Sequence, residues 1–482
     1  MSSCKHASTL AEPTGSGQNA RPFLEPSIVS ASAEEFRTLV RLALPLMAAQ
    51  LLQMAQGVMD TIMAGHLSAP DLAGIALGLN VLWPSQFLVS GFVLAATPII
   101  AQLRGAGRVA EVGEIVRQGF WIVLFAALVL MLFWSNVGFV YDGLGIEPHT
   151  KAIAIGYMHA TSWGAIPLLG YFLVRYLCEG MGYTKPAMYM ALAALVLKWP
   201  LNYAFMYGHW GIPQLGGVGC GWASAILWWA EFFGMLLVTR MPFVRVTGLF
   251  AKFSWPKWSV LQRFFVIGLP IGATGFAEVF AFSLMGLLIG RLGPETLASH
   301  QIVGNLNGMT FMVPLALGMA TTIRVGFNVG ANDFDRARLA ALVALRTAAL
   351  FAVVVGTLLL LGRFFVVALF STDPQVTTLA ATVVIFVAAY QLADDTQVVA
   401  IGALRGYKDT QVPMWIALFG YWIVAVPIAC WLGFGWLSWR PLGIYGFWTG
   451  MTAGLAFVAV AATYRLWRTA ADPRLIARLA ST

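Results

Sequence analysis

A few acidic side chains stand inside long apolar stretches of this sequence, where ionised groups are rare. Glu278 has aromatic and apolar neighbours, and Asp394 follows Tyr390 by four residues. Residues four apart share one face of a helix, so Tyr390 and Asp394 are expected to face one cavity. Two carboxylates and a phenol can hold Na⁺ or share a proton. The sequence therefore predicts a cation site at Glu278, Tyr390 and Asp394, and it leaves open whether H⁺ or Na⁺ binds to the two carboxylates.

Polar and aromatic residues near this site are candidates for a substrate cavity. On a helix Asp395 points about 100° away from Asp394, so one of the two aspartates is expected to play a lesser part. Phe276 and Phe280 can hold a flat cation by stacking and cation–π attraction. The candidate cavity residues are Gln53, Phe276, Phe280, Asp395 and Gln397. This set predicts lipophilic cationic small molecules as binding partners.

Three further charged residues fall in or beside apolar stretches. Asp60 lies about twenty residues into the first stretch, Lys198 lies near the middle of another, and Glu179 closes a third. A charge inside a membrane span costs a few kcal/mol, so it is usually kept where it lines a cavity or has a partner. The alternative for Asp60 and Lys198 is that each side chain snorkels to a membrane surface. Glu179 is expected to be interfacial.

The elements that carry these residues are predicted to be transmembrane helices. Of all residues 59% are hydrophobic and only 10% are charged, with a mean hydropathy of +0.77, whereas soluble domains average about 25% charged residues. Apolar runs long enough to cross a bilayer recur along the chain. We place twelve spans at about 40–64, 72–102, 115–140, 152–178, 186–208, 217–239, 261–289, 297–323, 339–369, 376–403, 412–434 and 442–466. The predicted fold is an all-α membrane protein.

The chain repeats itself. An offset of 225 places Pro45 on Pro270 and Asn80 on Asn305, and several Gly, Leu and Ala positions also coincide. Six spans in each half give both halves the same orientation, and a chain built as two related halves is typical of a secondary transporter. At this offset Glu278 falls on Gln53 and Asp60 falls on Met285. The halves are therefore expected to share a fold but not a site.

Basic residues predict the orientation. The outward loops hold only Lys151, Arg291, Arg363 and Arg440, and Lys198 lies within a span, so 24 of the 29 Lys and Arg residues lie on the cytoplasmic side. Both termini are then cytoplasmic, and the net charge of +8 faces the anionic inner leaflet rather than nucleic acid. We divide the chain into a flexible cytoplasmic tail (1–38), an N-lobe (39–240), a cytoplasmic linker (241–258), a C-lobe (259–468) and a cytoplasmic C-terminal tail (469–482).

The sequence offers no constellation for catalysis. Its four Cys and six His residues are scattered without metal-ligand spacing, and no phosphate-binding GxxxxGK[ST] motif occurs. We therefore expect neither an enzyme nor a cofactor, apart from the coupling ion. A lipid-linked precursor flippase of a related superfamily is the alternative transporter, and it would need a strongly cationic cavity.

Several motifs in order resemble the multidrug and toxin extrusion (MATE) family, and specifically its NorM-like branch, over residues 38–468. The motifs are Val58 to Gly65, Thr184 to Met188, Leu215 to Gly221, Glu278, Ala298 to Gln301 and Gly402 to Asp409. The resemblance implies a V-shaped pair of six-helix lobes that exports amphipathic, mostly cationic drugs by antiport with H⁺ or Na⁺. It places the C-lobe cation site at Glu278, Tyr390 and Asp394, and an N-lobe polar site at Asp60 and Asn202. We expect a monomer in the bacterial inner membrane.

One position departs from the NorM-like pattern. Where relatives carry an Asn one helical turn before Asn202, this chain has Lys198. An ammonium group facing Asp60 would form an internal ion pair in the place of a bound cation. We therefore count Lys198 in the N-lobe polar site and expect the C-lobe carboxylates to exchange the ion. The loss of an N-lobe ligand favours H⁺, or both ions, over Na⁺ alone.

Overall fold

The computed structural model describes residues 28–143, 146–371, 373–435 and 440–481, and every regular element in these ranges is a helix. The first half contains α1 (Ile28–Leu67), α2 (Ala69–Leu94), α3 (Ala96–Gly105), α4 (Val109–Ser135), α5 (Gly138–Asp142), α6 (Pro148–Ser162), α7 (Ala165–Gly180), α8 (Lys185–Tyr207), α9 (Gly217–Val238) and α10 (Pro242–Arg245). The second half contains α11 (Trp258–Gly290), α12 (Pro294–Gly330), α13 (Phe334–Ala368), α14 (Pro374–Gly406), α15 (Gln411–Leu418), the π-helix η1 (Phe419–Ala425), α16 (Val426–Phe434), α17 (Ile444–Ala471) and α18 (Pro473–Ser481).

Helices occupy all twelve predicted spans. By length and composition ten of them can cross a membrane, some as pairs of consecutive helices such as α2 with α3. The other two predicted spans are α6 with α7, which are short helices separated at Trp163 and Gly164, and α8, which carries Lys185 and Lys198. The prediction of an all-helical membrane protein is confirmed.

The predicted N-terminal tail is partly wrong. Residues 1–27 lie outside the described residues, but residues 28–38 form the first turns of α1. Glu35 in this segment is 3% exposed, and its carboxylate accepts a hydrogen bond of 2.7 Å from the Arg324 side chain of α12. The C-terminal tail is also helical, because α18 buries Ile476 completely. Tertiary contacts hold both segments, and their polar composition concealed these contacts.

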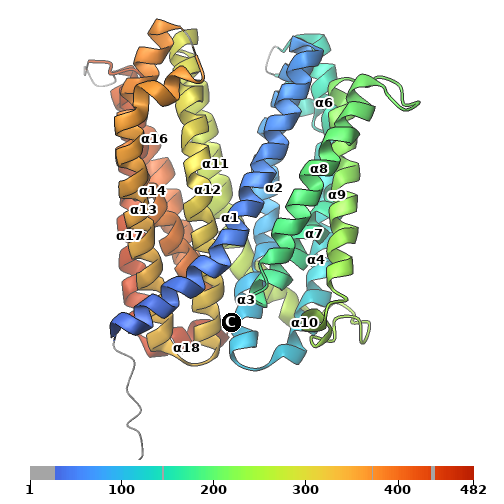
Figure 1. Ribbon diagram of the computed structural model, residues 1–482, viewed down its shortest axis with the longest axis vertical. Helices are drawn as coiled ribbons and strands as arrows, with labels where there is room; N and C mark the ends of the chain where they lie inside the picture. The colour runs from blue at the N-terminus through green and yellow to red at the C-terminus, as the bar shows by residue number, and fades with distance from the viewer. Residues whose placement is uncertain (1–27, 144–145, 372, 436–439, 482) are drawn as a thin grey trace, which may run out of the picture.

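The helices form two bundles that meet at one end and diverge toward the other (Figure 1). Two long helices pass from one bundle to the other. The first part of α1 packs Leu39 and Leu46 against α12 and α13, whereas its later part packs against α8. In α11, Ile267 belongs to the core of the first half and Ala281 to the core of the second. Each bundle therefore contains part of one helix from the other half of the sequence.

Glycines allow the bundles to meet closely at the end that carries α3, α10 and α18, called here the closed end. A Cβ on Gly105 would lie only 1.9 Å from the carbonyl oxygen of Phe327, and a Cβ on Gly330 would lie 1.9 Å from that of Gln102. The side-chain amide of Gln102 also donates a 2.9 Å hydrogen bond to the Gly406 carbonyl. The helix backbones touch here because no side chain stands between them.

The linker between the halves is fastened to α4. The Arg117 guanidinium donates to the carbonyl oxygens of Gly248 at 2.7 Å and Leu249 at 2.9 Å. Trp121 donates from its indole nitrogen to the Ser254 carbonyl at 3.0 Å. These bonds satisfy backbone groups that lie outside any helix, so the linker has a defined path.

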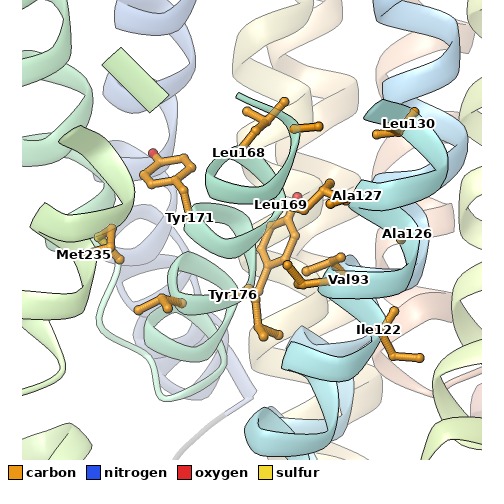
Figure 2. Packing of buried hydrophobic residues seen from close by; sticks show 14 of the residues in the cluster. Val93, Ile122, Ala126, Ala127, Leu130, Leu168, Leu169, Tyr171, Tyr176 and Met235 are labelled. Carbon is orange, nitrogen blue, oxygen red and sulfur yellow. The ribbon is translucent and has the colours of Figure 1, made fainter. Parts of the chain in front are cut away.

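The core of the first bundle lies between α4, α7 and α9. Figure 2 shows Ala127 of α4 on the side toward α7, with Tyr176 between these helices. Tyr171 lies on another side of α7, toward the helix that carries Met235. The small residues of α4 let α7 approach closely, which leaves α7 buried along most of its length.

Candidate functional site

The predicted cation site of the second half comes together from α11 and α14. Asp394 is 1% exposed and Tyr390 is completely buried, while Glu278 is partly exposed. The carboxylate of Glu278 is close enough to repel that of Asp394, and the Tyr390 hydroxyl interacts with both. Neither Oδ1 of Asp394 nor the Tyr390 hydroxyl has a hydrogen-bond partner among the described residues. These free oxygen atoms can accept a proton or contribute to the binding of a small cation.

Sequence reasoning missed a fourth member of this cluster, Tyr421. Its ring is completely buried, and its hydroxyl accepts a 2.7 Å hydrogen bond from the side-chain amide of Gln397 and interacts with Glu278. Tyr421 lies in the π-helix η1, which ends just before Pro427. Because proline has no N–H to bond the carbonyl of Ile423 and its ring crowds that carbonyl, the helix is easily widened here. The signal available in the sequence was a phenol in an otherwise apolar span.

Asp395 belongs to a separate network. Gln391 donates from its amide to Oδ1 of Asp395 at 2.8 Å, and it accepts from the Thr310 hydroxyl at 3.1 Å. Asp395 thus points away from Asp394, as expected from the rotation between neighbouring residues of a helix. Asp395 and Gln397 are 0% and 1% exposed. In this conformation neither is open to a drug-sized molecule, so their predicted place in a substrate cavity is not supported.

The other predicted cavity residues are more accessible. Phe276 and Phe280 stack with ring centroids 5.5 Å apart, and Phe280 stacks on Trp422 at 5.4 Å. Phe280 is 43% exposed, and Gln53 of α1 is partly exposed. Phe276 and Phe280 lie two residues before and two residues after Glu278 in α11, so their rings share a helix face that points away from the carboxylate. Trp422 was not predicted.

The N-lobe polar site is formed by α1, α8 and α9. Lys198 places its Nζ 3.1 Å from Oδ2 of Asp60 and donates to the Ser224 hydroxyl at 2.6 Å. Asn202 donates to the other carboxylate oxygen of Asp60 at 2.7 Å. Asp60 and Lys198 are 8% and 3% exposed, so neither snorkels to a surface. The predicted ion pair is present, and the ammonium group occupies one oxygen of Asp60.

The prediction that Glu179 is interfacial is wrong. Glu179 is completely buried, and its Oε1 lies 2.6 Å from Nε of Arg175, which is 1% exposed. Arg175 also donates to Oε1 of Gln50 in α1 at 3.1 Å. The Arg175 guanidinium offsets the cost of removing the Glu179 carboxylate from water. A spacing of four residues between Arg175 and Glu179 was the sequence signal that could have identified the pair.

Among the described residues, no group of three or more His, Cys, Asp or Glu side chains is arranged to hold a metal ion. Outside the spans, the closed end holds a buried lysine. Burial, together with repulsion from Arg263 and Arg108, lowers the pKa of Lys408 to about 8. Its ammonium donates to the Ala480 carbonyl at 3.0 Å, which ties α18 to the end of α14.

Comparison with known proteins agrees with the repeat. A family model described as MatE matches the chain twice, over residues 45–204 and 270–431. The multidrug resistance protein MdtK of Proteus mirabilis is 37% identical over 436 residues, which cover 90% of this chain and 95% of that protein. MdtK of Photorhabdus laumondii is 38% identical over 442 residues, which cover 91% and 97%.

Solved structures share the fold at low sequence identity. The eukaryotic MATE transporter AtDTX14 matches with a TM-score of 0.84 and 20% identity, over 93% of this chain and 99% of that one. A multidrug resistance MATE transporter of the MOP superfamily, solved in an outward-facing conformation, matches with a TM-score of 0.83 and 17% identity, over 93% and 98%. The V-shaped arrangement predicted for the two bundles is thus a known architecture.

Proposed function

The chain belongs to the MatE family, and from this premise we propose that it is a multidrug efflux transporter that exports amphipathic, mostly cationic drugs by antiport with H⁺ or Na⁺. The MdtK relatives are named as multidrug resistance proteins and match nearly the whole chain. Export against a gradient needs a site that binds the driving ion. The chain must supply that site from groups within its membrane spans.

The observation that carries this proposal is the cluster of Glu278, Tyr390, Asp394 and Tyr421. Two carboxylates face each other in apolar spans, and free oxygen atoms remain on Asp394 and Tyr390. Two like charges in a buried site repel unless a proton or cation lies between them. The site therefore favours binding of a positive ion, and release of that ion can be linked to a change between conformations.

Efflux by single variants tests this role. Glu278→Ala and Asp394→Ala should each abolish drug resistance in cells that lack other exporters, with near-normal amounts of protein in the membrane. Glu111→Ala is the matched control, since Glu111 is exposed and pairs with Arg108 on the surface. Full resistance in the Glu278→Ala variant would remove Glu278 from the coupling site.

The ion pair of Lys198 with Asp60 favours coupling through the second half and gives H⁺ an advantage over Na⁺. The ammonium group already provides a positive charge at the N-lobe polar site. Reconstituted protein should drive dye efflux in a pH gradient without Na⁺. Efflux that requires a Na⁺ gradient at equal pH and ignores the pH gradient would contradict this preference. Lys198→Asn should increase the response to Na⁺.

The aromatic row of Phe276, Phe280 and Trp422 supports flat cations as substrates. Stacking and cation–π attraction on these rings favour a molecule that is both flat and positively charged. Cationic dyes and fluoroquinolone-like drugs should be exported from vesicles, and Phe280→Ala should weaken dye export several-fold. Movement of anionic lipids alone would instead favour the flippase alternative.

We place the closed end at the cytoplasmic face of the inner membrane, so this conformation is open to the outside. The basic residues Arg108, Arg240, Arg245 and Lys252 support this orientation, because the regions that carry them lie at that end (Figure 1). Each candidate site is complete within one chain, which supports a monomer. A cysteine at Lys252 should react only with a reagent that enters the cytoplasm.

A further inference from the structure

A third carboxylate is buried in the first bundle without a counter-ion of its own. Glu231 of α9 is 5% exposed. It lies where both Lys198 of α8 and Arg175 of α7 attract its carboxylate. Within the described ranges it forms neither a salt bridge nor a hydrogen bond, although both cations are near. Glu231 therefore lies between two cations, and each of these cations already has another carboxylate as its partner.

The charges of this group do not balance if every member is ionised. Lys198 is paired with Asp60 at 3.1 Å, and Arg175 is paired with Glu179 at 2.6 Å. Two cations and three carboxylates leave one net negative charge inside the bundle. A buried net charge is costly, and a proton on Glu231 makes the group neutral.

The polar surroundings fit a protonated carboxyl group. The Tyr171 hydroxyl is buried and interacts most strongly with the Arg175 guanidinium and, after it, with Glu231. Figure 2 shows Tyr171 directed toward the helix of Met235, and Met235 lies one turn beyond Glu231 on the same face of α9. A carboxylic acid offers both a donor and an acceptor to such a hydroxyl.

The titratable groups on the other helices packed against α9 lie away from Glu231. Tyr157 of α6 interacts with Asp60 and Cys220. Asp71 of α2 accepts a 2.6 Å hydrogen bond from the Gly217 backbone, in the first turn of α9. Gly217 lies about 20 Å along the helix from Glu231. The groups that face Glu231 are thus Lys198, Arg175 and Tyr171.

We propose that Glu231 is a proton-binding site of the first bundle, and that loss of its proton draws Lys198 away from Asp60. The O–H bond of the Glu231 carboxyl breaks, the proton passes to water, and the carboxylate keeps the electron pair. Ser224, which now binds Lys198, lies two turns from Glu231 on the same face of α9, so the ammonium can move along that face. Asp60 is then free to bind a cationic substrate, and one proton leaves as one positive charge enters. This mechanism rests on the proposed export of cationic drugs.

Infrared spectroscopy of the full-length protein in lipid vesicles tests the proton itself. Protonated carboxylic acids give a carbonyl band that ionised carboxylates lack, and the band shifts in D₂O. Glu231→Gln should lose one such band at neutral pH, and the control Glu111→Gln should lose none. An unchanged set of bands in Glu231→Gln would show that Glu231 is ionised and would overturn the proposal. The band does not depend on transport, so it can be measured even if the proposed function fails.

Proton release on substrate binding tests the link to Lys198. In a Glu278→Gln/Asp394→Asn background the second-half carboxylates no longer titrate. Addition of a cationic dye to this protein in weak buffer should still release about one proton per dye bound, and adding Glu231→Gln should abolish the release. Dye binding without proton release in the background protein would refute the exchange.

Discussion

Adding one methyl group at the closed end should shift the protein toward a conformation that is open there. In Gly105→Ala, the new Cβ would lie 1.9 Å from the Phe327 carbonyl oxygen, and ordinary contact begins at 3.4 Å. The neighbouring helix must therefore move by about 1.5 Å. Both clashing groups belong to helices with backbone hydrogen bonds, so no flexible side chain can absorb the clash.

The expected magnitude follows from the cost of overpacking. Extra methyl groups in a packed interior cost about 1–3 kcal/mol. If this cost falls only on the closed conformation, its population relative to the open one should decrease about 5- to 150-fold. The inter-bundle hydrogen bond from Gln102 to Gly406, at 2.9 Å, should also weaken.

Spin labels on the two bundles measure this shift. Arg108 and Asp335 are exposed at the closed end and can be replaced by labelled cysteines, because the native Cys178, Cys220 and Cys430 are buried and Cys4 can be changed to Ser. Gly105→Ala should add a longer distance between the labels.

The matched control for this measurement is Gly304→Ala on α12, where a Cβ would meet nothing within 4 Å. Its distance distribution should equal that of the wild type. If Gly105→Ala also matches the wild type while remaining folded, the contact between α3 and α12 does not control opening.

Other predictions concern stability. Glu179→Gln leaves the buried Arg175 without its counter-charge and should lower the free energy of unfolding by about 3–5 kcal/mol. The control Glu111→Gln should change the free energy of unfolding by less than about 0.5 kcal/mol. Equal thermal unfolding of the two variants would contradict this prediction. The pKa of Lys408 is about 8 in the folded protein, and its ordinary value is 10.5. Between these two pH values the unfolded chain binds more protons than the folded protein. The free energy of unfolding should therefore rise with pH across this window by up to about 3 kcal/mol. Lys408→Met should remove that rise in thermal unfolding. Arg117→Ala breaks the bonds to Gly248 and Leu249, so limited proteolysis should cut the linker faster than in the wild type.

Local patterns in the sequence were sufficient to predict the helices and part of the candidate site. Apolar runs of membrane length specify helices because an unpaired backbone group in lipid is too costly. The four-residue spacing of Tyr390 and Asp394 places both on one helix face. Lys198 was identified as a charge within a span, and Asn202 followed from the resemblance to the MATE family; both side chains approach Asp60.

Contacts between distant helices decided the rest. Tyr421 belongs to the cation site and lies in a π-helix. No periodicity in the sequence predicts where this π-helix occurs. Glu231 lies beside Arg175 and Lys198 because α7, α8 and α9 pack together, and nothing within α9 indicates this.

The sequence alone determined that this chain is a membrane protein of two related halves with acidic groups in its spans. Those features depend on composition, local periodicity and the repeat. Only the tertiary structure decided which charges meet, and that α1 and α11 each pass from one bundle to the other. The physical reason is that the energy of a buried charge depends on every group within a few ångströms, and most of those groups come from other helices.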